Sequence, residues 1–340
     1  MNNEYNHSRR KTPWDGLAHL SASQSFVKEA YLDVYNRRHI SLKDSHEEEF
    51  LNTFTPCECR RCGSVRFEKY GHTKNGLNRY LCHDCGHTFT ILTGTIFEDH
   101  KISVIEWVEQ LLQVIGYEST TMASRNGRNA ITTTKYWNAK LFLVLQNYAD
   151  NIILSGDKVQ IDEMYYSQVK HKKVLREDGK QFAGISRNQF CIGIGVDGRQ
   201  TLALYEGHMA RPKISDTWNT FGKHIEPGSH LKHDLEKTHS VLVNRLNLTE
   251  EKFNSNEIKK LEDSKNPLYP VNHACFLVRR FLDSHSGFNR DELQGYLDLC
   301  MFILNEPNDI LEKVRILLIS ALYCSKTLKY RDYYSNKSHK

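Results

Sequence analysis

Two pairs of closely spaced cysteines limit what this chain can fold into more than any other feature of its sequence. The motif CRRCG begins at Cys59 and the motif CHDCG begins at Cys82, with 19 residues between the two pairs. Zinc takes four thiolates in a tetrahedron, and a glycine after each pair lets the backbone turn and point its amides at the sulfur atoms. The spacer is long enough for a β-ribbon. We therefore predict a structural zinc ion with four protein ligands, Cys59, Cys62, Cys82 and Cys85.

The overall composition narrows the class of protein without identifying it. The chain has 340 residues, of which 39% are hydrophobic, and this is enough for two or three domains with their own cores. Nine cysteines, an odd number in a chain without an apolar secretory signal, favour metal binding over disulfide bonds. No apolar run reaches the ~18 residues of a membrane span. These features argue against membrane, secreted and fibrous proteins and predict a cytoplasmic protein.

Basic residues gather around the two cysteine pairs. A net charge of +5 is too small to indicate nucleic-acid binding by itself, so the distribution of charge has to decide. Residues 56–90 contain three acidic and six basic residues, interleaved with aromatic rings. The basic residues are Arg60, Arg61, Arg66, Lys69, Lys74 and Arg79. Such a face suits a nucleic-acid backbone, with Arg60 and Arg61 as candidate contacts; a ribbon that is merely solvated is the alternative.

The chain changes to a helical period after Ile102. The sequence predicts one helix from there to Gly116, a short helix over 118–124, a turn at Asn126, and a longer helix over 131–145. The expected buried stripes are Ile105, Val108, Leu111, Leu112 and Ile115 in the first helix and Ile131, Trp137, Leu141, Val144 and Leu145 in the last. This order of helices and turn is typical of a helix-turn-helix.

The expected solvent side of these helices is basic. It carries Arg125, Arg128, Lys135 and Lys140 against Glu118 alone. A recognition helix presents its N-terminal residues to the bases, while basic residues around it bind phosphates. We therefore predict that Arg125, Arg128 and Lys135 bind DNA, with plain helical packing as the alternative.

Beyond residue 150 the pattern changes to strands. The expected strands cover residues 158–165, 189–196, 200–206 and 230–234. The expected helices cover residues 214–225, 235–247, 272–282 and 292–304, and the charged segment 249–266 is expected to be a linker or a helical insertion. This order matches an RNase H-like core, which has three antiparallel strands, a helix, a fourth strand and flanking helices.

The whole chain is therefore expected to be a multidomain protein of the α+β or α/β class. Its expected parts are an N-terminal helical or flexible segment (1–50), a zinc ribbon (51–101), a helix-turn-helix-like DNA-binding segment (102–150), an RNase H-like catalytic domain (151–305) and a C-terminal helix with a basic tail (306–340). No chemistry is assigned to the first of these parts.

Polar residues near the ends of the expected strands suggest a second metal site. Asp162 lies in the first strand of the expected catalytic domain, Asp234 closes the fourth, and Asn272 opens a helix. Mg²⁺ prefers oxygen ligands, and two such ions ~3.5–4 Å apart are the arrangement that phosphodiester cleavage uses. Strand alternation does not decide between Asp162 and its neighbour Glu163, so both residues stay open.

These motifs, in this order, resemble the transposases of bacterial insertion-sequence family 1595. The resemblance covers about residues 55–305 and is carried by the CxxCG pairs, the helical segment, VQIDEMYY, HLKHDLEKTH and PVNHACFLVRRFL…SGFNRDELQGYLDLCMFILN. It implies an RNase H-like enzyme that cleaves and joins DNA with Mg²⁺. The implied partner is double-stranded DNA, both the terminal inverted repeats and the target, bound by a homo-oligomer associated with the nucleoid.

The resemblance also implies roles for individual residues. Asp162 and Asp234 match the first two catalytic acids of the family and would bind Mg²⁺. The third family position is either Glu or Asn with a basic residue seven positions later, and Asn272 with Arg279 matches the Asn form. Glu-type members have their acid where this chain has Cys275. An Asn carbonyl can bind Mg²⁺ but adds no negative charge, so we expect weaker metal binding.

Three functions stay open on the sequence alone. The first is a DNA transposase, which the presence of both Asp162 and Asp234 favours. The second is a zinc-ribbon regulator, derived from a transposase, that binds element ends without cutting them. The third is a nuclease or resolvase that cleaves DNA but does not join it.

Overall fold

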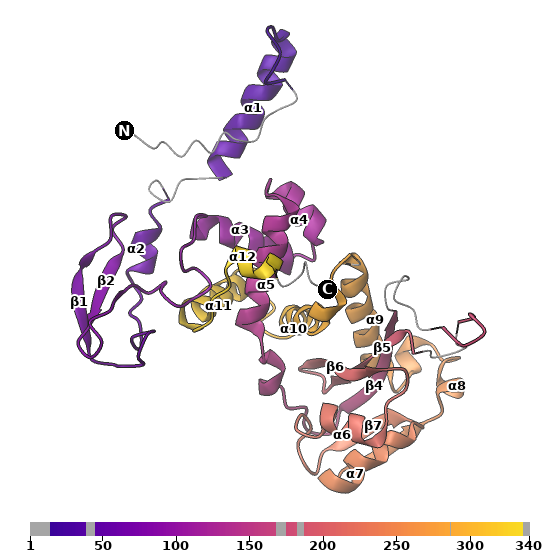
Figure 1. Cartoon of the computed structure of the whole chain (residues 1–340). Coiled ribbons are helices and arrows are strands. Elements are labelled where there is room, and N and C mark those ends of the chain that lie inside the picture. Colours follow the sequence, from indigo (N-terminus) through magenta and orange to yellow (C-terminus); the bar gives the residue numbers. More distant parts are fainter. Residues whose placement is uncertain (1–13, 39–44, 168–174, 182–186, 286, 336–340) are drawn as a thin grey trace. The chain divides into compact units, whose positions relative to one another are not determined.

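The chain divides into two compact units, which are described separately (Figure 1). The computed structural model describes residues 14–38, 45–167, 175–181, 187–285 and 287–335. The first unit contains Met1–Val144 and Ile310–Lys340, and the second contains Leu145–Asp309. The predicted mixed α and β class is confirmed, with one sheet in each unit. Among the described residues, no helix combines the length and the apolar character needed to cross a membrane.

The sheet of the first unit is the antiparallel ribbon predicted around the cysteine pairs. It has the order β1-β2-β3 and consists of β1 (Phe67–His72), β2 (Asn78–Cys82) and β3 (Thr88–Phe89). The rings of Phe67, Tyr80 and Phe89 pack together with centroids 5.3 to 5.8 Å apart. They cover the buried cysteines Cys59 and Cys82. Three of the aromatic residues therefore form the core of the ribbon, whereas Tyr70 is exposed beneath the guanidinium of Arg79.

Helices make up the rest of the first unit. They are α1 (Ala22–Arg38), α2 (Glu47–Leu51), α3 (Val104–Ile115), α4 (Thr120–Asn126), α5 (Ile131–Leu145), α11 (Ile310–Tyr323) and α12 (Tyr330–Ser335). Ser103 and Ser119 cap α3 and α4, because their hydroxyls accept hydrogen bonds from backbone amides three residues later, at 3.4 and 3.2 Å. α11 packs against α3, so the C-terminal segment belongs to the same unit as the predicted helix-turn-helix.

The buried faces of α3 and α5 agree with the predicted stripes in part and differ at the first residue of each stripe. Buried as predicted are Leu111, Ile115, Trp137, Leu141 and Leu145. Ile105 and Ile131 are 45% and 41% exposed. The buried side of α3 instead contains Val104 and Trp107, and the indole of Trp107 stacks on that of Trp137 with ring centroids 5.9 Å apart. Because a Trp ring buries more apolar surface than an Ile side chain, the stacked pair turns these residues inward and leaves the two isoleucines outside.

The second unit is built on a five-stranded sheet. Its strands are β4 (Val159–Ser167), β5 (Gln189–Val196), β6 (Thr201–Met209), β7 (His230–Asp234) and β8 (Thr249–Phe253). They lie in the order β6-β5-β4-β7-β8. The first three strands along the chain pair in antiparallel fashion, whereas β7 is parallel to β4 and β8 is parallel to β7. The four predicted strands are confirmed, with β6 ending three residues later than expected.

Helices cover both faces of this sheet. They are α6 (Ile214–Phe221), α7 (Ser240–Leu246), α8 (Ser255–Ile258), α9 (Tyr269–Ser284) and α10 (Leu293–Leu304), with short 3₁₀ helices η2 (Tyr148–Asn151), η4 (Lys237–His239), η5 (Asp263–Lys265) and η6 (Arg290–Glu292). The side chain of Gln160 accepts a hydrogen bond from the backbone of Val271 in α9, at 3.2 Å. A Cβ at Gly193 would lie 2.7 Å from the Phe221 ring of α6. Gly193 pairs with Glu163 and therefore lies on the same face of the sheet as the Glu163 side chain. Because Glu163 is three residues after Gln160, their side chains point to opposite faces, so α6 and α9 cover opposite faces of the sheet.

The prediction of a linker or helical insertion over 249–266 is wrong for its first part, which forms β8. The five residues of this strand read TEEKF, and the first four are exposed. Their charged side chains pair across the edge of the sheet, as in the 3.3 Å contact between Lys232 and Glu251. A charged edge strand lacks the apolar alternation by which a strand is predicted, which is why the pattern missed it.

Candidate functional site

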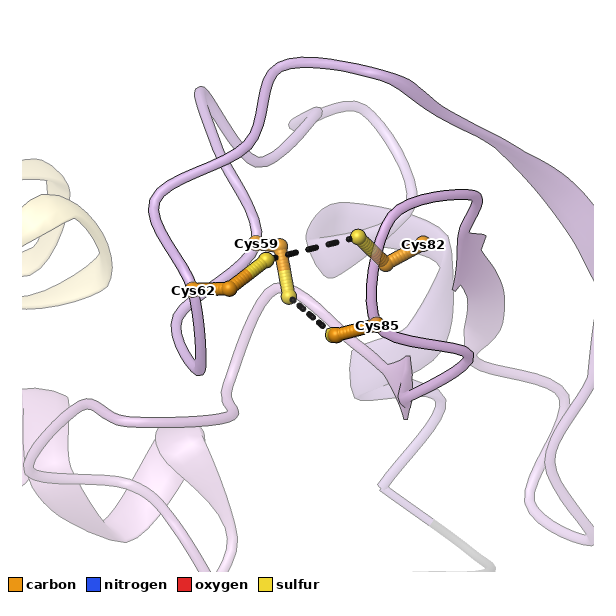
Figure 2. A group of neighbouring side chains, drawn as sticks. All are labelled: Cys59, Cys62, Cys82 and Cys85. Atoms are coloured by element: carbon orange, nitrogen blue, oxygen red, sulfur yellow. Dashed lines mark hydrogen bonds between the residues drawn. The ribbon is translucent and has the colours of Figure 1, made fainter.

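Four cysteine side chains converge in the first unit (Figure 2). The sulfur of Cys59 lies 3.7 Å from that of Cys85, and the sulfur of Cys62 lies 3.6 Å from that of Cys82. All four sulfur atoms lie within 4.8 Å of one another. Sulfur atoms ~2.3 Å from one tetrahedral zinc ion would be roughly 3.8 Å apart. The predicted convergence of the two pairs is confirmed, and the cluster is consistent with a zinc site.

Both cysteine pairs lie in the same kind of backbone turn. The amide of Gly63 donates to the carbonyl of Cys59 at 2.8 Å, and the amide of Gly86 donates to that of Cys82 at 3.0 Å. The two glycines have φ angles of 72° and 67°, a left-handed conformation that favours glycine. Burial would raise the pKa of the Cys82 thiol, but the backbone amides that follow it lower the pKa to about 6. The amides of this turn therefore stabilise the Cys82 thiolate. At Cys62 an amide hydrogen bond is outweighed by burial and the neighbouring thiols, which raise its pKa to about 12, and the pKa of Cys85 is also raised.

The two arginines predicted to bind DNA from the ribbon lie in different surroundings. Arg61 is exposed. Arg60 is half-buried, and its guanidinium donates to the hydroxyl of Ser325 and, at 3.4 Å, to the carbonyl of Tyr323. The described contacts of Arg60 are therefore within the protein, while Arg61 is free of this constraint and faces solvent.

The basic residues of the helices divide in the same way. Arg125 and Lys135 are exposed. Arg128 lies over the ring of Tyr31, 4.5 Å from its centroid, and donates to the Tyr31 carbonyl at 2.9 Å. The expectation that Lys140 lies on the solvent side is wrong, because its side chain is buried and donates to a backbone carbonyl of the core. A long lysine side chain can be covered along its apolar stem, and a charge pattern does not reveal this.

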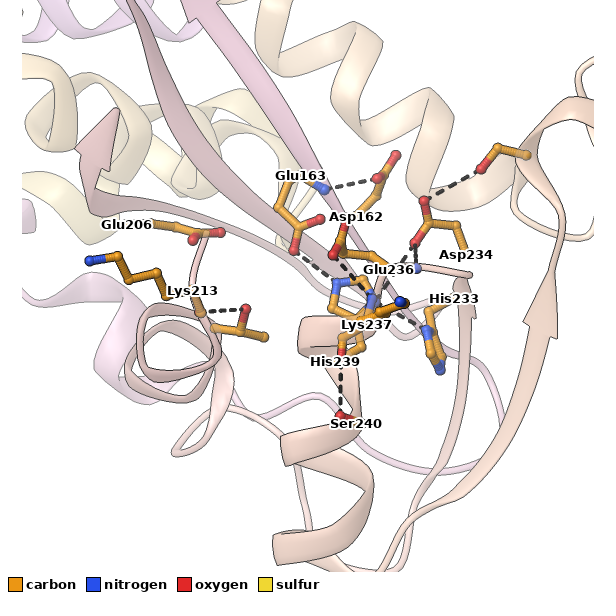
Figure 3. A network of polar contacts seen from close by, with 12 residues as sticks. Asp162, Glu163, Glu206, Lys213, His233, Asp234, Glu236, Lys237, His239 and Ser240 are labelled. Carbon is orange, nitrogen blue, oxygen red and sulfur yellow. Dashed lines mark hydrogen bonds and ion pairs between the residues drawn. The ribbon is translucent and has the colours of Figure 1, made fainter. Parts of the chain in front are cut away.

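In the second unit the two predicted aspartates lie level with each other. β7 runs parallel to β4, with Gln160 opposite Lys232. Extending this register by two residues brings Asp162 level with Asp234 on the same face of the sheet. The neighbouring acid, Glu163, points to the opposite face, which is covered by α6. The register therefore places Asp162, and not Glu163, on the same face of the sheet as Asp234, while the metal-binding role of either acid stays a prediction (Figure 3).

The surroundings of Asp162 favour its protonated form. Burial, followed by the negative charges of Glu163 and Asp234, raises the pKa of Asp162 to about 7. The carboxylate of Asp234 accepts a hydrogen bond from the amide of Glu236 at 2.9 Å and lies 3.4 Å from the hydroxyl of Ser255. Two acids held this closely repel each other unless a positive charge lies between them. Oxygen donors in this arrangement are the type that hard divalent cations bind.

Two buried histidines connect these acids to the edge of the sheet (Figure 3). His239 Nε2 lies 2.8 Å from an oxygen of Glu163, and His239 Nδ1 lies 3.0 Å from Nδ1 of His233 and 3.8 Å from Asp234. The other nitrogen of His233 lies 3.2 Å from Glu250 on β8. Burial by itself lowers the pKa of His239, but the hydrogen bond and charge of Glu163 outweigh it, so the pKa is raised overall. The surroundings of His239 therefore shift its titration toward the cationic form, next to Asp234.

The third predicted ligand, Asn272, lies in the first turn of α9, which begins three residues earlier. Its side chain is exposed. Cys275, one turn later, is close enough to Asp162 that burial and the Asp162 charge raise the pKa of its thiol. Arg279, a further turn along, donates to a backbone carbonyl of β4 at 3.1 Å. The described contacts of Cys275 and Arg279 join α9 to β4. Among the described contacts there is none between Asn272 and either aspartate, so a metal-binding role of Asn272 stays a prediction.

Pattern reasoning misses His233 and His239 as parts of the site. Both lie close to Asp234 in the segment HDLEKTH, and this proximity to an acid is the one available signal. The signal is weak because His239 belongs to the turn after β7, while its partner Glu163 belongs to β4. The contact exists only once the two strands have paired.

No protein-family model matches this chain, and a search of curated proteins finds no matching sequence. Any function is therefore inferred from the residues and contacts described above.

Proposed function

We propose that this protein is a transposase of the kind found in bacterial insertion-sequence family 1595, which its sequence resembles. It binds the ends of an insertion sequence as a homo-oligomer and catalyses Mg²⁺-dependent cleavage and transfer of DNA strands. The observation that carries the proposal is the position of Asp162 and Asp234, level with each other on adjacent parallel strands and coupled through their charges. Carboxylates in this position are what a two-metal phosphodiester site needs.

The topology of the second unit supports the proposal. Three antiparallel strands are followed by two parallel ones, which add to the sheet next to the first strand. This is the strand order of an RNase H-like core. Asp162 lies on the central strand of the sheet and Asp234 at the end of its parallel neighbour. The topology thus gives both acids a rigid frame, as catalytic groups require.

Each residue of the site has a role in this proposal. Asp162 and Asp234 hold the metal ions, with Asn272 as a neutral oxygen ligand. When bound, Mg²⁺ makes the attacking water or hydroxyl more acidic and stabilises the leaving oxygen. Arg279, held at the carbonyl of β4, presents its positive charge to the DNA phosphate. The ring of His239 is held by the Glu163 carboxylate and lies beside Asp234, so it orients the Asp234 carboxylate for metal binding.

The first unit supplies DNA binding in this proposal. A structural zinc ion at the four cysteines holds the ribbon together, and the exposed residues Arg61, Arg125 and Lys135 contact the DNA backbone. Arg60 and Arg128 have protein partners and serve mainly to position these surfaces. Neutralised phosphates release counterions, so binding should weaken steeply with salt, and each lost phosphate contact should reduce the salt slope by ~1.

A second candidate function is a regulator that binds the element ends without cutting them. One observation favours it. The charge of Asp162 acts on Cys275 of α9, a thiol, at the position where Glu-type members of the family have an acid. A buried thiol does not replace a carboxylate as a ligand of Mg²⁺. The regulator hypothesis therefore makes the opposite prediction about cleavage and the same prediction about binding.

Cleavage by the full-length protein distinguishes the two functions. The substrate is a labelled duplex that carries the inverted repeats flanking the gene, incubated with Mg²⁺ or Mn²⁺. The wild type should cleave the duplex and join the ends to target DNA, and Asp162→Asn and Asp234→Asn should do neither. Asp263→Asn is the matched control, because it neutralises an exposed acid of the same unit. Wild-type rates in both site variants would show that the catalytic assignment is wrong.

Two further outcomes separate the remaining hypotheses. A wild type that shifts the duplex in a gel but never cuts it supports the regulator, and one that cuts without joining supports a nuclease or resolvase. Within the transposase hypothesis, Asn272→Ala should lower the cleavage rate severely. Asn272→Asp should keep or raise the rate, because it keeps an oxygen ligand and adds a charge.

A further inference from the structure

A second group of metal-binding side chains lies on the face of the sheet opposite to Asp162. Cys191 of β5 pairs with Tyr165 of β4, three residues after Asp162, and therefore points to the other face. That face is covered by α6, since a Cβ at Gly193 would lie 2.7 Å from an α6 side chain. The group thus lies on the face opposite to Asp162, and the charge of Glu163, which acts on both Cys191 and Asp162, couples it to the proposed active site.

An irregularity in β6 brings two more ligands to Cys191. The register between β5 and β6 shifts so that residues 206–208 all lie opposite Cys191. Gly207, in the middle, has a φ of 76°, a conformation that favours glycine. Glu206 and His208 flank it, and the ligand atoms of Cys191, Glu206 and His208 all lie within 4.8 Å of one another. The bulge therefore assembles a thiol, a carboxylate and an imidazole.

The contacts inside this group match those around a metal ion. His208 Nε2 lies 3.1 Å from Glu206 Oε2 and 3.6 Å from Asp216 Oδ2. Ligand atoms ~2.1 Å from a tetrahedral zinc ion would be roughly 3.4 Å apart. His208 Nδ1 lies 3.4 Å from the backbone carbonyl of Met209. Metal-binding histidines commonly donate their second nitrogen to such a carbonyl, so His208 is oriented to bind through Nε2.

One buried oxygen of the group has no hydrogen-bond partner among the described residues. The side chain of Glu206 is 0% exposed, and its Oε1 makes no hydrogen bond there. An unsatisfied buried acceptor costs about 1–3 kcal/mol, and more when it is charged. A cation bound by the group would satisfy this oxygen. His208 and Asp216, whose side chains are 21% and 24% exposed, form the side through which an ion can reach it.

We propose that Cys191, Glu206 and His208 bind a transition-metal ion of the zinc class, with the carboxylate of Asp216 beside His208 but outside this three-ligand group. A thiolate and an imidazole together with a carboxylate suit zinc, whereas Mg²⁺ takes only oxygen ligands. Asp216 lies in the first turn of α6 and accepts a hydrogen bond from the amide of Lys213 at 2.9 Å. The ion therefore ties the bulge of β6 to the adjoining β5. Its role is structural, and it does not depend on the proposed transposase activity.

The zinc content of the full-length protein tests this site. Each protein is purified from zinc-supplemented cells, dialysed against metal-free buffer and analysed by mass spectrometry. Cys191→Ala and His208→Gln should each contain one zinc ion per chain fewer than the wild type. The measured quantity is a difference between variants, so zinc bound at the four-cysteine cluster cancels. His208 is partly exposed at a sheet edge, and its replacement by Gln should therefore leave the fold intact.

Cys300→Ala is the matched control, because it removes another fully buried thiol of the second unit, in α10. It should keep the zinc content of the wild type. After replacement of zinc by Co²⁺, the difference spectrum between the wild type and Cys191→Ala should show a thiolate-to-cobalt charge-transfer band. Equal zinc content in the wild type, Cys191→Ala and His208→Gln would overturn the proposal, as would a loss in Cys300→Ala equal to that in Cys191→Ala.

Discussion

The four-cysteine cluster and the Asp162–Asp234 site show two ways in which a chain can bring polar groups together. The cysteines come from two similar turns of one ribbon, within residues 59–85. The aspartates are far apart in the sequence and become neighbours only because β7 pairs with β4. The first arrangement is a property of local turns, and the second is a property of the topology of the whole unit.

The two sites also differ in how the protein treats the charge of its ligands. Backbone amides lower the pKa of Cys82 and thereby favour its ionised form, in spite of burial. At the other site, burial and the charges of neighbouring acids raise the pKa of Asp162. At Cys62, in contrast, burial and the neighbouring thiols raise the pKa to about 12, so the amides favour the thiolate at Cys82 and not across the whole cluster. The aspartates are held against their own repulsion. Groups kept at a cost to stability are typical of functional sites.

The largest effect is expected from breaking the cysteine cluster. Cys82→Ser should unfold the ribbon, residues 56–90, because metal binding contributes the folding free energy of such modules, about 10–16 kcal/mol in zinc-finger peptides. Hydrogen exchange of the full-length protein should show loss of protection in β1 and β2 and unchanged protection in β4 and β5. Cys57→Ser, which alters an exposed cysteine outside the cluster, is the control. A ribbon that stays protected in Cys82→Ser would refute the claim that the ion completes its fold.

The opposite pattern is expected at the aspartates. Asp162→Asn should reduce cleavage by at least ~10³-fold, since several kcal/mol of transition-state stabilisation depend on the metal ions it holds. The same change removes a repulsive charge, so the free energy of unfolding in the presence of a chelator should be unchanged or up to about 2 kcal/mol higher. Urea unfolding at neutral pH measures this, with Asp263→Asn as the control. Substantial destabilisation by Asp162→Asn would mean that its carboxylate is structural.

A smaller effect is expected from His239, which contacts Glu163 and lies beside Asp234. His239→Gln should lower the cleavage rate by about 10–100-fold, as is usual for residues that orient metal ligands. The loss should be in kcat and in the pH profile, because the imidazole acts through the aspartate and not through DNA binding. His230→Gln, which alters a partly exposed histidine of the preceding strand β7, should cleave at nearly the wild-type rate. Equal rates for the two variants would remove His239 from the site.

The contrast between the two sites also explains which parts of them could be predicted from the sequence alone. The CxxCG spacing was sufficient to predict the cysteine cluster, because short turns determine where their residues lie. Alternation could not separate Asp162 from Glu163, since the positions of α6 and α9 decide which face is which. The strand state of β8 likewise depends on its pairing with β7 and not on the pattern of TEEKF. Long-range pairing is the information that local patterns lack.

Lys140 of the first unit extends the comparison to a single buried charge outside either cluster. Its ammonium donates to the carbonyl of Ile96 at 2.5 Å and lies 4.7 Å from the centroid of the Tyr136 ring. Burial lowers the pKa of Lys140 from 10.5 to about 8. Between these two values the unfolded chain binds more protons than the folded chain, so the free energy of unfolding should rise with pH in this range.

Lys140→Met should abolish that rise, because it removes the group that titrates differently in the two states. The expected difference between the wild type and the variant amounts to roughly 1–2 kcal/mol over about pH 8 to pH 10. Urea unfolding at several pH values in this range measures it, and Lys135→Met, which removes an exposed lysine of the same helix, should behave like the wild type. If Lys140→Met keeps the wild-type slope, the ammonium is not buried as a charge. In that case the cost of a buried charge in this protein would be limited to the repulsion between acids, as at Asp162 and Asp234.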